Sequence, residues 1–329
     1  MDAKTRLSEI ANGYQHSVVL LTACKLGVFA ALGEGARRVD DLGRELKLDR
    51  RGLEIVLLAL TADGFLKREG DGFRVVPDYA PYVLAGSPHT QASMFNHAYS
   101  CLLRWAQLET VLKTGRPAPR ETGLTGEQEL RDFICGMANI SRESSAEVAV
   151  KVDLSGYRRM LDLGGGPGTS SIVFARKHPN LRCVVFDLKG AIAIAREEIE
   201  KAGLSDRVET RVADYFEDDF GEGFDLVYIS NIIHSTGPDD TAMIARESWR
   251  ALVDGGTVIV KDFFLDDTRT SPVQGAFFSV NMLVGTEQGR SYTLTETKEI
   301  LERAGFGDFR TVAVAAASTL LIARKKPGQ

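Results

Sequence analysis

The spacing of apolar residues predicts an α/β fold for the second half of the chain. From residue 156 onward, short apolar runs alternate with longer segments of helical periodicity, a pattern typical of a parallel sheet covered by helices. The five runs expected to be strands are residues 160–163, 181–187, 207–213, 224–230 and 256–262. Two further runs, 309–314 and 319–324, predict a hairpin at the edge of this sheet.

The first hundred residues have a different pattern. Apolar residues at helical spacing predict helices over 7–32, 39–46 and 49–60. Two short runs, 65–68 and 73–76, flank a glycine-containing turn and predict a hairpin. Three helices followed by a two-stranded wing form a winged-helix pattern.

These patterns divide the chain into a mainly α, winged-helix-like domain over 1–105, a helical linker over 106–155 and an α/β domain over 156–329. A long helix predicted over 127–150 carries Phe133 and Met137. Core packing is one interpretation of these two residues, and the lining of a ligand pocket is the other.

A glycine-rich turn follows the first strand of the α/β domain, with the spacing Asp162-x-Gly164-x-Gly166-x-Gly168. Glycines allow backbone N–H groups and a helix N-terminus to approach a ligand closely. A dinucleotide fingerprint would need a third glycine where Thr169 stands, and a P-loop would need Gly-Lys-Ser/Thr. The spacing is instead similar to the first motif of S-adenosylmethionine-dependent methyltransferases, although a merely tight turn is the alternative.

The next two strands also end in carboxylates. Asp187, at the end of the second strand, is placed to accept hydrogen bonds from ribose hydroxyls, with helix capping as the alternative. Asp214 follows the third strand, where an acidic residue of this fold class lies beside the adenine amino group. Tyr215 or Phe216 could then cover the adenine ring. Together with the glycine turn, these strand ends predict a nucleoside pocket.

His234 follows the fourth strand, and Asp262 ends the fifth. In a parallel α/β sheet the ligand crevice lies at the carboxyl ends of the strands, so both residues are candidates for chemistry there. A packed or capping histidine is the alternative.

Charge argues against a nucleic-acid partner or an anionic membrane, because the net charge is −5 and basic and acidic residues nearly balance between positions 37 and 74. The apolar segment 17–32 is interpreted as a surface buried against a second copy, which predicts a homodimer through the N-terminal domain. No apolar run of about 18 residues and no signal peptide occurs. With four scattered cysteines, this predicts a cytoplasmic protein with reduced thiols.

Taken in order, the winged helix, the linker helices, the 162–168 turn and the Asn-Ile-Ile-His run at 231–234 resemble the plant-type small-molecule O-methyltransferase family and its bacterial relatives. The resemblance covers nearly the whole chain. It implies a Rossmann-like class I methyltransferase domain, an N-terminal winged-helix dimerisation domain, and S-adenosyl-L-methionine as cofactor with S-adenosyl-L-homocysteine as product. No metal is implied, because a histidine occupies the position of the base.

The resemblance also implies roles for individual residues. His234 would be the general base and Asp262 its acidic partner. The implied cofactor-binding residues are Asp162, Gly164, Gly166, Gly168, Asp187, Leu188, Asp214, Tyr215, Phe216 and Ser230. The implied acceptor pocket comprises Phe133, Met137, Phe278 and Met282.

Two departures from the family pattern concern the base. Ser235 follows the histidine where many members have an acidic residue, and a second acidic position matches near Ser291. The expected reaction is O-methylation of an aromatic or polyketide-like small molecule. Alternatives are N- or C-methylation by alignment without a base, a S-adenosylmethionine-binding enzyme with other chemistry, and a ligand-sensing winged-helix regulator.

Overall fold

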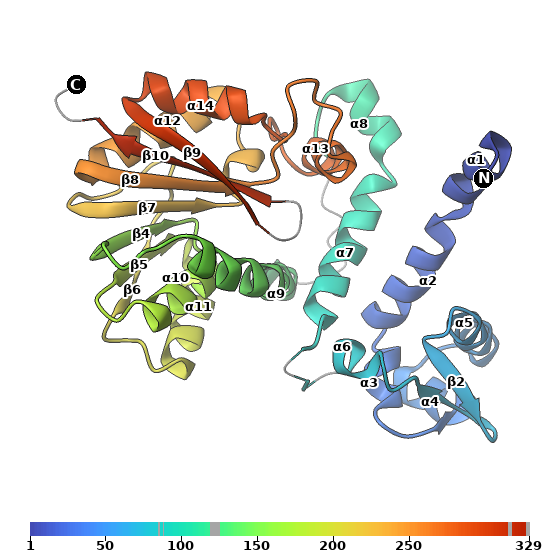
Figure 1. Ribbon diagram of the computed structural model, residues 1–329. Coiled ribbons are helices and arrows are strands. Elements are labelled where there is room, and N and C mark those ends of the chain that lie inside the picture. The colour runs from blue at the N-terminus through green and yellow to red at the C-terminus, as the bar shows by residue number, and fades with distance from the viewer. Residues whose placement is uncertain (85, 88, 119–125, 315–317, 327–329) are drawn as a thin grey trace. The chain divides into compact units, whose positions relative to one another are not determined.

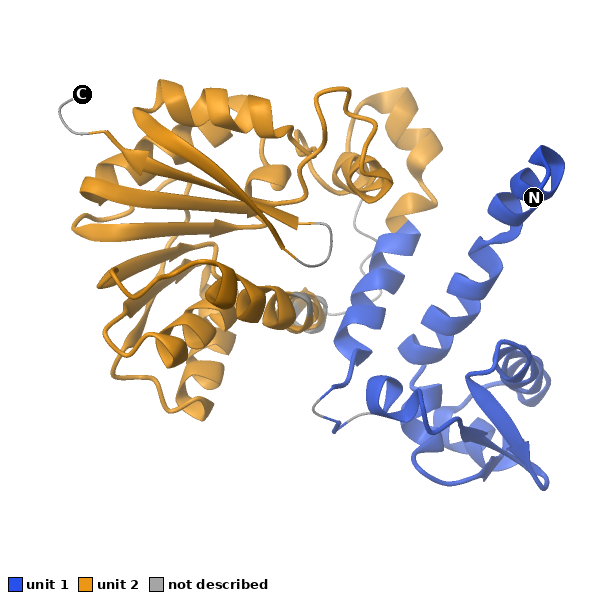
Figure 2. Cartoon of the chain, in the orientation of Figure 1, with its two compact units in different colours: residues 1–103 blue, residues 104–329 orange. Residues whose placement is uncertain are grey.

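The computed structural model describes residues 1–84, 86–87, 89–118, 126–314 and 318–326 (Figure 1). The chain divides into two compact units, Met1–Leu103 and Arg104–Gln329 (Figure 2). Within the described ranges, no helix has the length and apolar character needed to cross a membrane.

The first unit contains short helices and a small sheet. Its elements are α1 (Ala3–Asn12), α2 (Tyr14–Lys25), α3 (Val28–Leu32), β1 (Arg37–Arg38), α4 (Val39–Leu46), α5 (Arg50–Ala62), β2 (Leu66–Glu69), β3 (Gly72–Val75), α6 (Ala80–Val83) and α7 (Ala92–Trp105), which runs to the unit boundary. The strands form an antiparallel sheet in the order β1-β3-β2. The predicted helices over 39–46 and 49–60 and the wing hairpin are thereby confirmed.

The helix expected over 7–32 is three helices, because the chain breaks at Gly13 and again before Gly27, whose φ of +74° is left-handed. The interpretation of 17–32 as a surface covered by a second copy is wrong for its buried side chains. Phe29 and Leu32 pack with Leu57 of α5 in the core of the unit itself. Leu26 is the large apolar side chain that stays exposed within this segment, and Leu7, Ile10 and Tyr14 before it are also exposed.

The second unit is the expected α/β domain. Its elements are α8 (Leu108–Thr114), α9 (Gly126–Lys151), β4 (Arg159–Leu163), α10 (Thr169–Lys177), β5 (Arg182–Asp187), α11 (Lys189–Lys201), β6 (Val208–Val212), β7 (Phe224–Ser230), the 3-10 turn η1 (Ile233–Ser235), α12 (Pro238–Ala251), β8 (Leu252–Asp262), α13 (Val273–Gly285), α14 (Leu294–Arg303), β9 (Phe306–Val314) and β10 (Ser318–Lys325). The strand order is β6-β5-β4-β7-β8-β10-β9. The first five strands in this order pair in parallel, and β10 and β9 form the expected antiparallel hairpin at the edge.

Helices cover both faces of this sheet, with α9, α10 and α11 on one side and α12 and α14 on the other (Figure 1). On the α9–α11 side, Met160 and Ile259 pack with Phe174 of α10. On the α12–α14 side, Val260 packs with Ile244 of α12. Because side chains alternate along a strand, the residues at the carboxyl ends divide between the same two faces.

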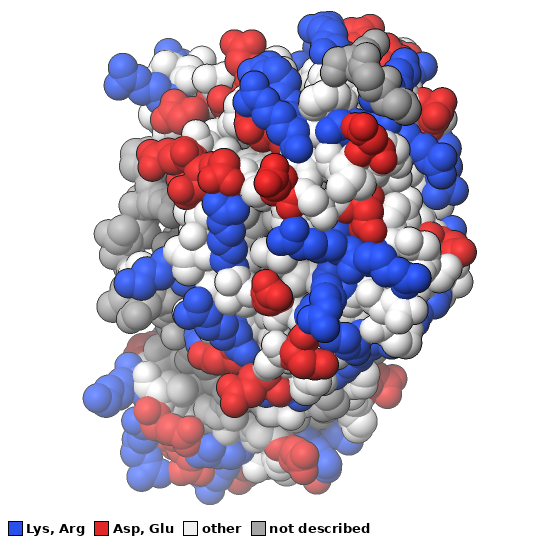
Figure 3. All heavy atoms as spheres, turned by 90° about the vertical axis from the view of Figure 1, so that its left-hand side faces the viewer, with Lys and Arg blue, Asp and Glu red and all other residues white. Residues whose placement is uncertain are grey.

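The surface carries charges of both signs. On the face shown in Figure 3, described Lys and Arg side chains are interspersed with Asp and Glu. Several exposed ion pairs of the second unit are short-range pairs on its helices, such as Lys201 with Glu198 and Arg250 with Glu247. Exposed pairs of this kind contribute little to stability, so the core rather than the surface holds the domain together.

Candidate active site

The glycine turn connects β4 to α10 in a left-handed backbone conformation. Gly164, Gly166 and Gly168 have φ angles of +63°, +55° and +73°. The N–H of Gly164 donates to the carbonyl of Phe186, 2.8 Å away, and so joins the turn to β5. A Cβ on Gly164 would lie 2.3 Å from Cδ1 of Ile232, whereas one on Gly166 would meet nothing within 4 Å. The turn is therefore closely packed at its base and open beside Gly166, as a backbone cradle for a ligand requires.

Asp162 fastens this turn to the first residues of α10. Its side chain is 1 % exposed, and its carboxyl accepts a hydrogen bond of 2.6 Å from the hydroxyl of Ser171. Burial raises the pKa of Asp162 to about 6, and the hydrogen bonds of Ser171 act in the opposite direction. Asp162, which the family resemblance implies as a cofactor-binding residue, thus makes a buried hydrogen bond within the protein.

Asp187 ends β5 beside the turn. Its two carboxylate oxygens accept hydrogen bonds from the N–H groups of Gly166 at 2.8 Å and Leu188 at 2.7 Å. Burial raises the pKa of Asp187, and these two bonds counteract the rise. A carboxylate offers about four acceptor positions, so about two remain for ligand hydroxyls. The side chain of Leu188, 57 % exposed, lies at the start of α11.

Asp214, Tyr215 and Phe216 form a turn after β6. The carboxylate of Asp214 accepts from the N–H of Phe216 at 2.9 Å. The rings of Tyr215 and Phe216 lie 4.5 Å apart, with Tyr215 half-buried and Phe216 49 % exposed. Burial raises the pKa of the Tyr215 hydroxyl. Since β6, β5, β4 and β7 are parallel neighbours, this turn, Asp187, the glycine turn and Ser230 at the end of β7 share one sheet edge.

His234 and Asp262 form a buried pair at the same edge. The ring Nδ1 lies 2.7 Å from a carboxylate oxygen of Asp262, and the two residues are 9 % and 3 % exposed. The carboxylate also accepts from the backbone N–H groups of His234 at 3.3 Å and Phe263 at 2.8 Å. A carboxylate facing Nδ1 places the ring proton there and leaves Nε2 with its lone pair. The ring is therefore oriented to accept a proton at Nε2.

Aromatic rings border this histidine. Phe278 of α13 meets the imidazole edge to face, with centroids 4.7 Å apart, and the Phe263 ring lies 4.7 Å from Phe278. Met282, one helical turn after Phe278, is buried, as expected for a lining residue on the same helix face. Phe263 was missed in the sequence, where its only signal was its position directly after Asp262.

The remaining pocket candidates lie on α9, which packs on α10 and α11. Phe133 is 43 % exposed and Met137 is half-buried. α9 also reaches the first turn of α10, because the hydroxyls of Ser145 and Ser170 lie 2.9 Å apart. A pocket role for Phe133 and Met137 remains a prediction.

The structure shows the surroundings of the two positions at which the sequence departs from the family pattern. Ser291 donates its hydroxyl hydrogen to the carbonyl of Gly275 of α13 at 2.9 Å. Gly289, two residues before Ser291, lies against the turn that carries His234. A Cβ on Gly289 would be 2.6 Å from the carbonyl oxygen of His234. Ser235 donates to the carbonyl of Ile232. Within the described chain, Asp262 is thus the carboxylate that His234 contacts.

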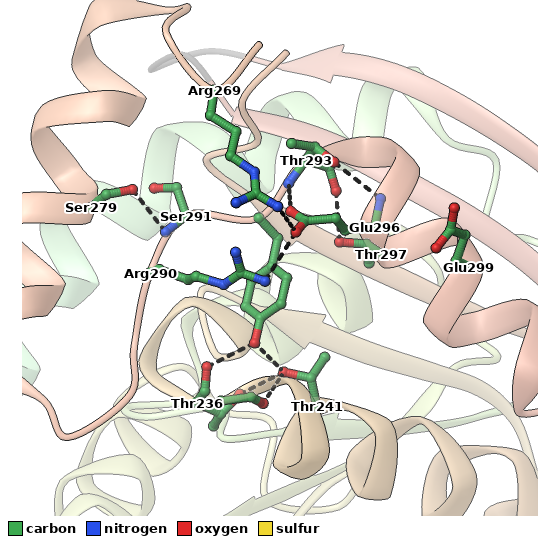
Figure 4. Close-up of polar contacts among 12 residues, drawn as sticks. Thr236, Thr241, Arg269, Ser279, Arg290, Ser291, Thr293, Glu296, Thr297 and Glu299 are labelled. Carbon is green, nitrogen blue, oxygen red and sulfur yellow. Dashed lines mark hydrogen bonds and ion pairs between the residues drawn. The ribbon is translucent and has the colours of Figure 1, made fainter. Parts of the chain in front are cut away.

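A second polar network holds the far end of the histidine turn (Figure 4). The hydroxyl of Tyr292 donates to the carbonyl of Thr236 at 2.9 Å and accepts from Thr241 at 3.1 Å. The guanidinium of Arg290 lies over the Tyr292 ring and pairs with Glu296 at 3.0 Å, and Glu296 closes the capping box of α14. The turn that carries His234 is therefore tied to the start of α14, a link that the sequence did not indicate.

Comparison with protein-family models finds two matches. Residues 112–307 match the O-methyltransferase domain, and residues 8–80 match the O-methyltransferase dimerisation domain.

Individual relatives match over nearly the whole chain. The 3-hydroxy-5-methyl-1-naphthoate 3-O-methyltransferase of Streptomyces sahachiroi is 33 % identical, over 95 % of this chain and 92 % of the relative. The tetracenomycin polyketide synthesis 8-O-methyl transferase of Streptomyces glaucescens is 30 % identical, over 96 % and 95 %. Among solved structures, human N-acetylserotonin methyltransferase in complex with S-adenosylmethionine superposes with a TM-score of 0.85 at 26 % identity, covering 99 % of both chains.

Proposed function

The chain belongs to the O-methyltransferase family, and from that premise we propose that it methylates a hydroxyl of an aromatic or polyketide-like acceptor, with His234 as general base. It is an S-adenosylmethionine-dependent methyltransferase. The observation that carries the proposal is the buried His234–Asp262 pair, which lies beside the Phe278 ring at the sheet edge that holds the glycine turn.

The residues at this edge fit the cofactor. The open backbone beside Gly166 suits the methionine part, and the two uncommitted acceptor positions of Asp187 suit the ribose hydroxyls. The Asp214 carboxylate and the Tyr215 and Phe216 rings suit adenine. When bound, the cofactor supplies a methyl group on a sulfonium, which is the electrophile.

His234 would take the proton from the acceptor hydroxyl. A phenol has a pKa of about 10 and a histidine about 6.5, so complete transfer before attack would cost about 4.8 kcal/mol. A base therefore works best when it removes the proton as the oxygen attacks, which accelerates a reaction by about 10²–10⁴-fold. Asp262 fixes the ring orientation for this step.

The acceptor class is inferred from the walls of the site and from the relatives. Phe278, Phe263 and Met282 give an apolar, aromatic surface next to His234. The two Streptomyces relatives are named for a hydroxynaphthoate and a tetracenomycin polyketide. We assign the same class of planar, hydroxylated acceptor to this chain, with Phe133 and Met137 of α9 as further lining residues.

The assembly proposed is a homodimer through the first unit. Residues 8–80 match the dimerisation domain of the family. Helix α1, which overlaps the start of this range, has no buried residue. A second copy is the simplest cover for its exposed apolar side chains.

The function is tested with His234→Ala. Calorimetry should show that the wild type and the variant bind S-adenosylhomocysteine with similar affinity, because His234 lies outside the cofactor-binding set. Turnover on the best acceptor from a panel of phenols, hydroxynaphthoates and amines should fall by about 10²–10⁴-fold. Asp262→Ala should cost less, since it positions the ring without taking the proton.

Two results would contradict the proposal. A wild type that does not bind S-adenosylhomocysteine would remove the cofactor assignment. Near-wild-type turnover by His234→Ala would refute the general base, and a preference for amine acceptors would then favour N-methylation by alignment alone.

A further inference from the structure

Lys261 is a buried cation that the proposed function does not use. It is the penultimate residue of β8, pairs in register with Ser230 of β7 and Leu320 of β10, and is 1 % exposed. In the part of the chain that the structure describes, its ammonium makes no hydrogen bond and no ion pair, and the nitrogen is not among the fully enclosed polar atoms without a partner, so a ligand or solvent can reach it. Burial lowers the pKa of Lys261 to about 8, and the charge of Asp262 opposes this shift.

The alternation of side chains places Lys261 on the same sheet face as the cofactor-binding candidates. Lys261 lies two residues after Ile259, which packs on the face covered by α9–α11. Asp162 and Ser230 lie two residues after Met160 and Tyr228, which belong to the same packed cluster. All three therefore stand at the carboxyl ends of neighbouring strands on one face.

The carboxylates of the site make their hydrogen bonds elsewhere, and within the described residues none of them forms an ion pair with this ammonium. Asp162 binds the Ser171 hydroxyl. Asp187 accepts from two backbone N–H groups, and Asp262 is hydrogen-bonded to His234 and to the N–H of Phe263. A buried charge without a hydrogen-bonded partner is costly, and buried charges in proteins are normally paired. The missing partner is thus expected from outside the chain.

We propose that Lys261 binds the carboxylate of a ligand held at this sheet edge. The inference rests on the proposed function, because that function brings two carboxylate sources to the edge. One is the methionine carboxylate of the cofactor, and the other is a carboxylate on a hydroxyaromatic acceptor. An ammonium and a carboxylate paired in a buried site attract each other strongly, so the lysine would help to fix ligand orientation and select for the acid.

The test compares Lys261→Met with Lys298→Met, a matched change at a half-exposed lysine on α14. Without ligand, Lys261→Met should unfold at the same or a higher temperature than the wild type, since it removes an unpaired buried charge. A marked loss of thermal stability would instead mean that the lysine serves the fold through Asp262, and would overturn the proposal.

Calorimetry then identifies the source of the carboxylate. If it is the cofactor, Lys261→Met should weaken S-adenosylhomocysteine by about 30-fold or more but leave the decarboxylated analogue S-adenosyl-3-thiopropylamine unchanged. If it is the acceptor, S-adenosylhomocysteine binding stays intact. In that case the wild type, loaded with S-adenosylhomocysteine, prefers a hydroxynaphthoate over the naphthol that lacks the acid, and the variant loses this preference.

The inference fails if the variant binds all of these ligands as the wild type does, or if it weakens the acids and the counterparts that lack the carboxylate equally. It also fails if the wild type shows no preference for the acid in either pair. Its failure is distinguishable from failure of the proposed function. In the first case the wild type still binds S-adenosylhomocysteine and methylates a hydroxyl, whereas in the second it does not.

Discussion

Carboxylates that look alike in the sequence have different roles at the residue scale. Asp162, Asp187 and Asp262 each stand at or near the end of a strand. The buried carboxyl of Asp162 accepts a hydrogen bond from Ser171. Asp187 accepts one from Gly166 and has further acceptor positions beside the turn. Asp262 binds the ring nitrogen of His234. The packing around each side chain, rather than its residue type, decides which of them can meet a ligand.

The burial of Asp162 predicts a pH dependence of stability. Its folded-state pKa of about 6 lies above the ordinary value of 3.8, so the folded state binds this proton more tightly than the unfolded state. The contribution of Asp162 to the free energy of unfolding should therefore be greatest below about pH 4 and fall by about 3 kcal/mol as pH rises through 6. Denaturant unfolding of wild type and Asp162→Asn between pH 4 and 7 measures this, and a difference between the two proteins that stays constant with pH would contradict it.

At the scale of elements, the turn that carries His234 depends on a contact from a distant loop. Thr236 follows the turn, and its carbonyl accepts a hydrogen bond from Tyr292, which precedes α14. Asp262 at the end of β8 fastens the other side of the same turn. His234 is thus held between the end of β8 and the loop before α14.

Tyr292→Phe tests this arrangement. Loss of the two hydroxyl contacts should lower the free energy of unfolding by about 1–2 kcal/mol, because the partners Thr236 and Thr241 are buried. If the tyrosine positions the turn, kcat should fall by about tenfold, while KM for the acceptor and affinity for S-adenosylhomocysteine stay the same. Tyr82→Phe, at a tyrosine that is 49 % exposed, is the control. If stability falls but kcat is unchanged, Tyr292 stabilises the fold and does not position the turn that carries His234.

At the scale of the whole molecule, α1 has an uncovered apolar side. Leu7 and Ile10 are 69 % and 68 % exposed, and no residue of this helix is buried. An amphipathic helix without a covering surface is typical of a protein interface.

Ile10→Asp should therefore convert a homodimer to a monomer at tens of micromolar, measured by light scattering. The helical circular dichroism signal should persist, because Ile10 contributes nothing to the core of the unit. Leu112→Asp, a change at a 70 % exposed leucine in the second unit, should leave the dimer intact. A wild type that is already monomeric would refute the proposed assembly.

Much of the fold could be predicted from the sequence because its signals are local. A buried parallel strand needs a continuous apolar run, so the sequence predicts β4, β5 and β7 nearly to the residue. The edge strand β6, with one buried residue, is predicted from its β-branched residues and its place in the alternation of strands and helices. The spacing of the glycines predicts the turn after β4. Because the strands are parallel, their carboxyl ends must lie along the same side of the sheet. The segment 17–32 was misjudged because an apolar stretch looks the same whether α5 or a second chain covers it.

The sequence by itself determined the order of the elements, the glycine turn and the residue types at the strand ends, since each follows from patterns within a few residues. Only the tertiary structure decided that Gly289 lies against the carbonyl of His234, that Tyr292 holds its turn, and that Lys261 is buried at the end of β8. These facts depend on contacts between residues 31 to 56 positions apart. Such contacts exist only once the sheet has brought distant strand ends together, and local patterning carries no record of them.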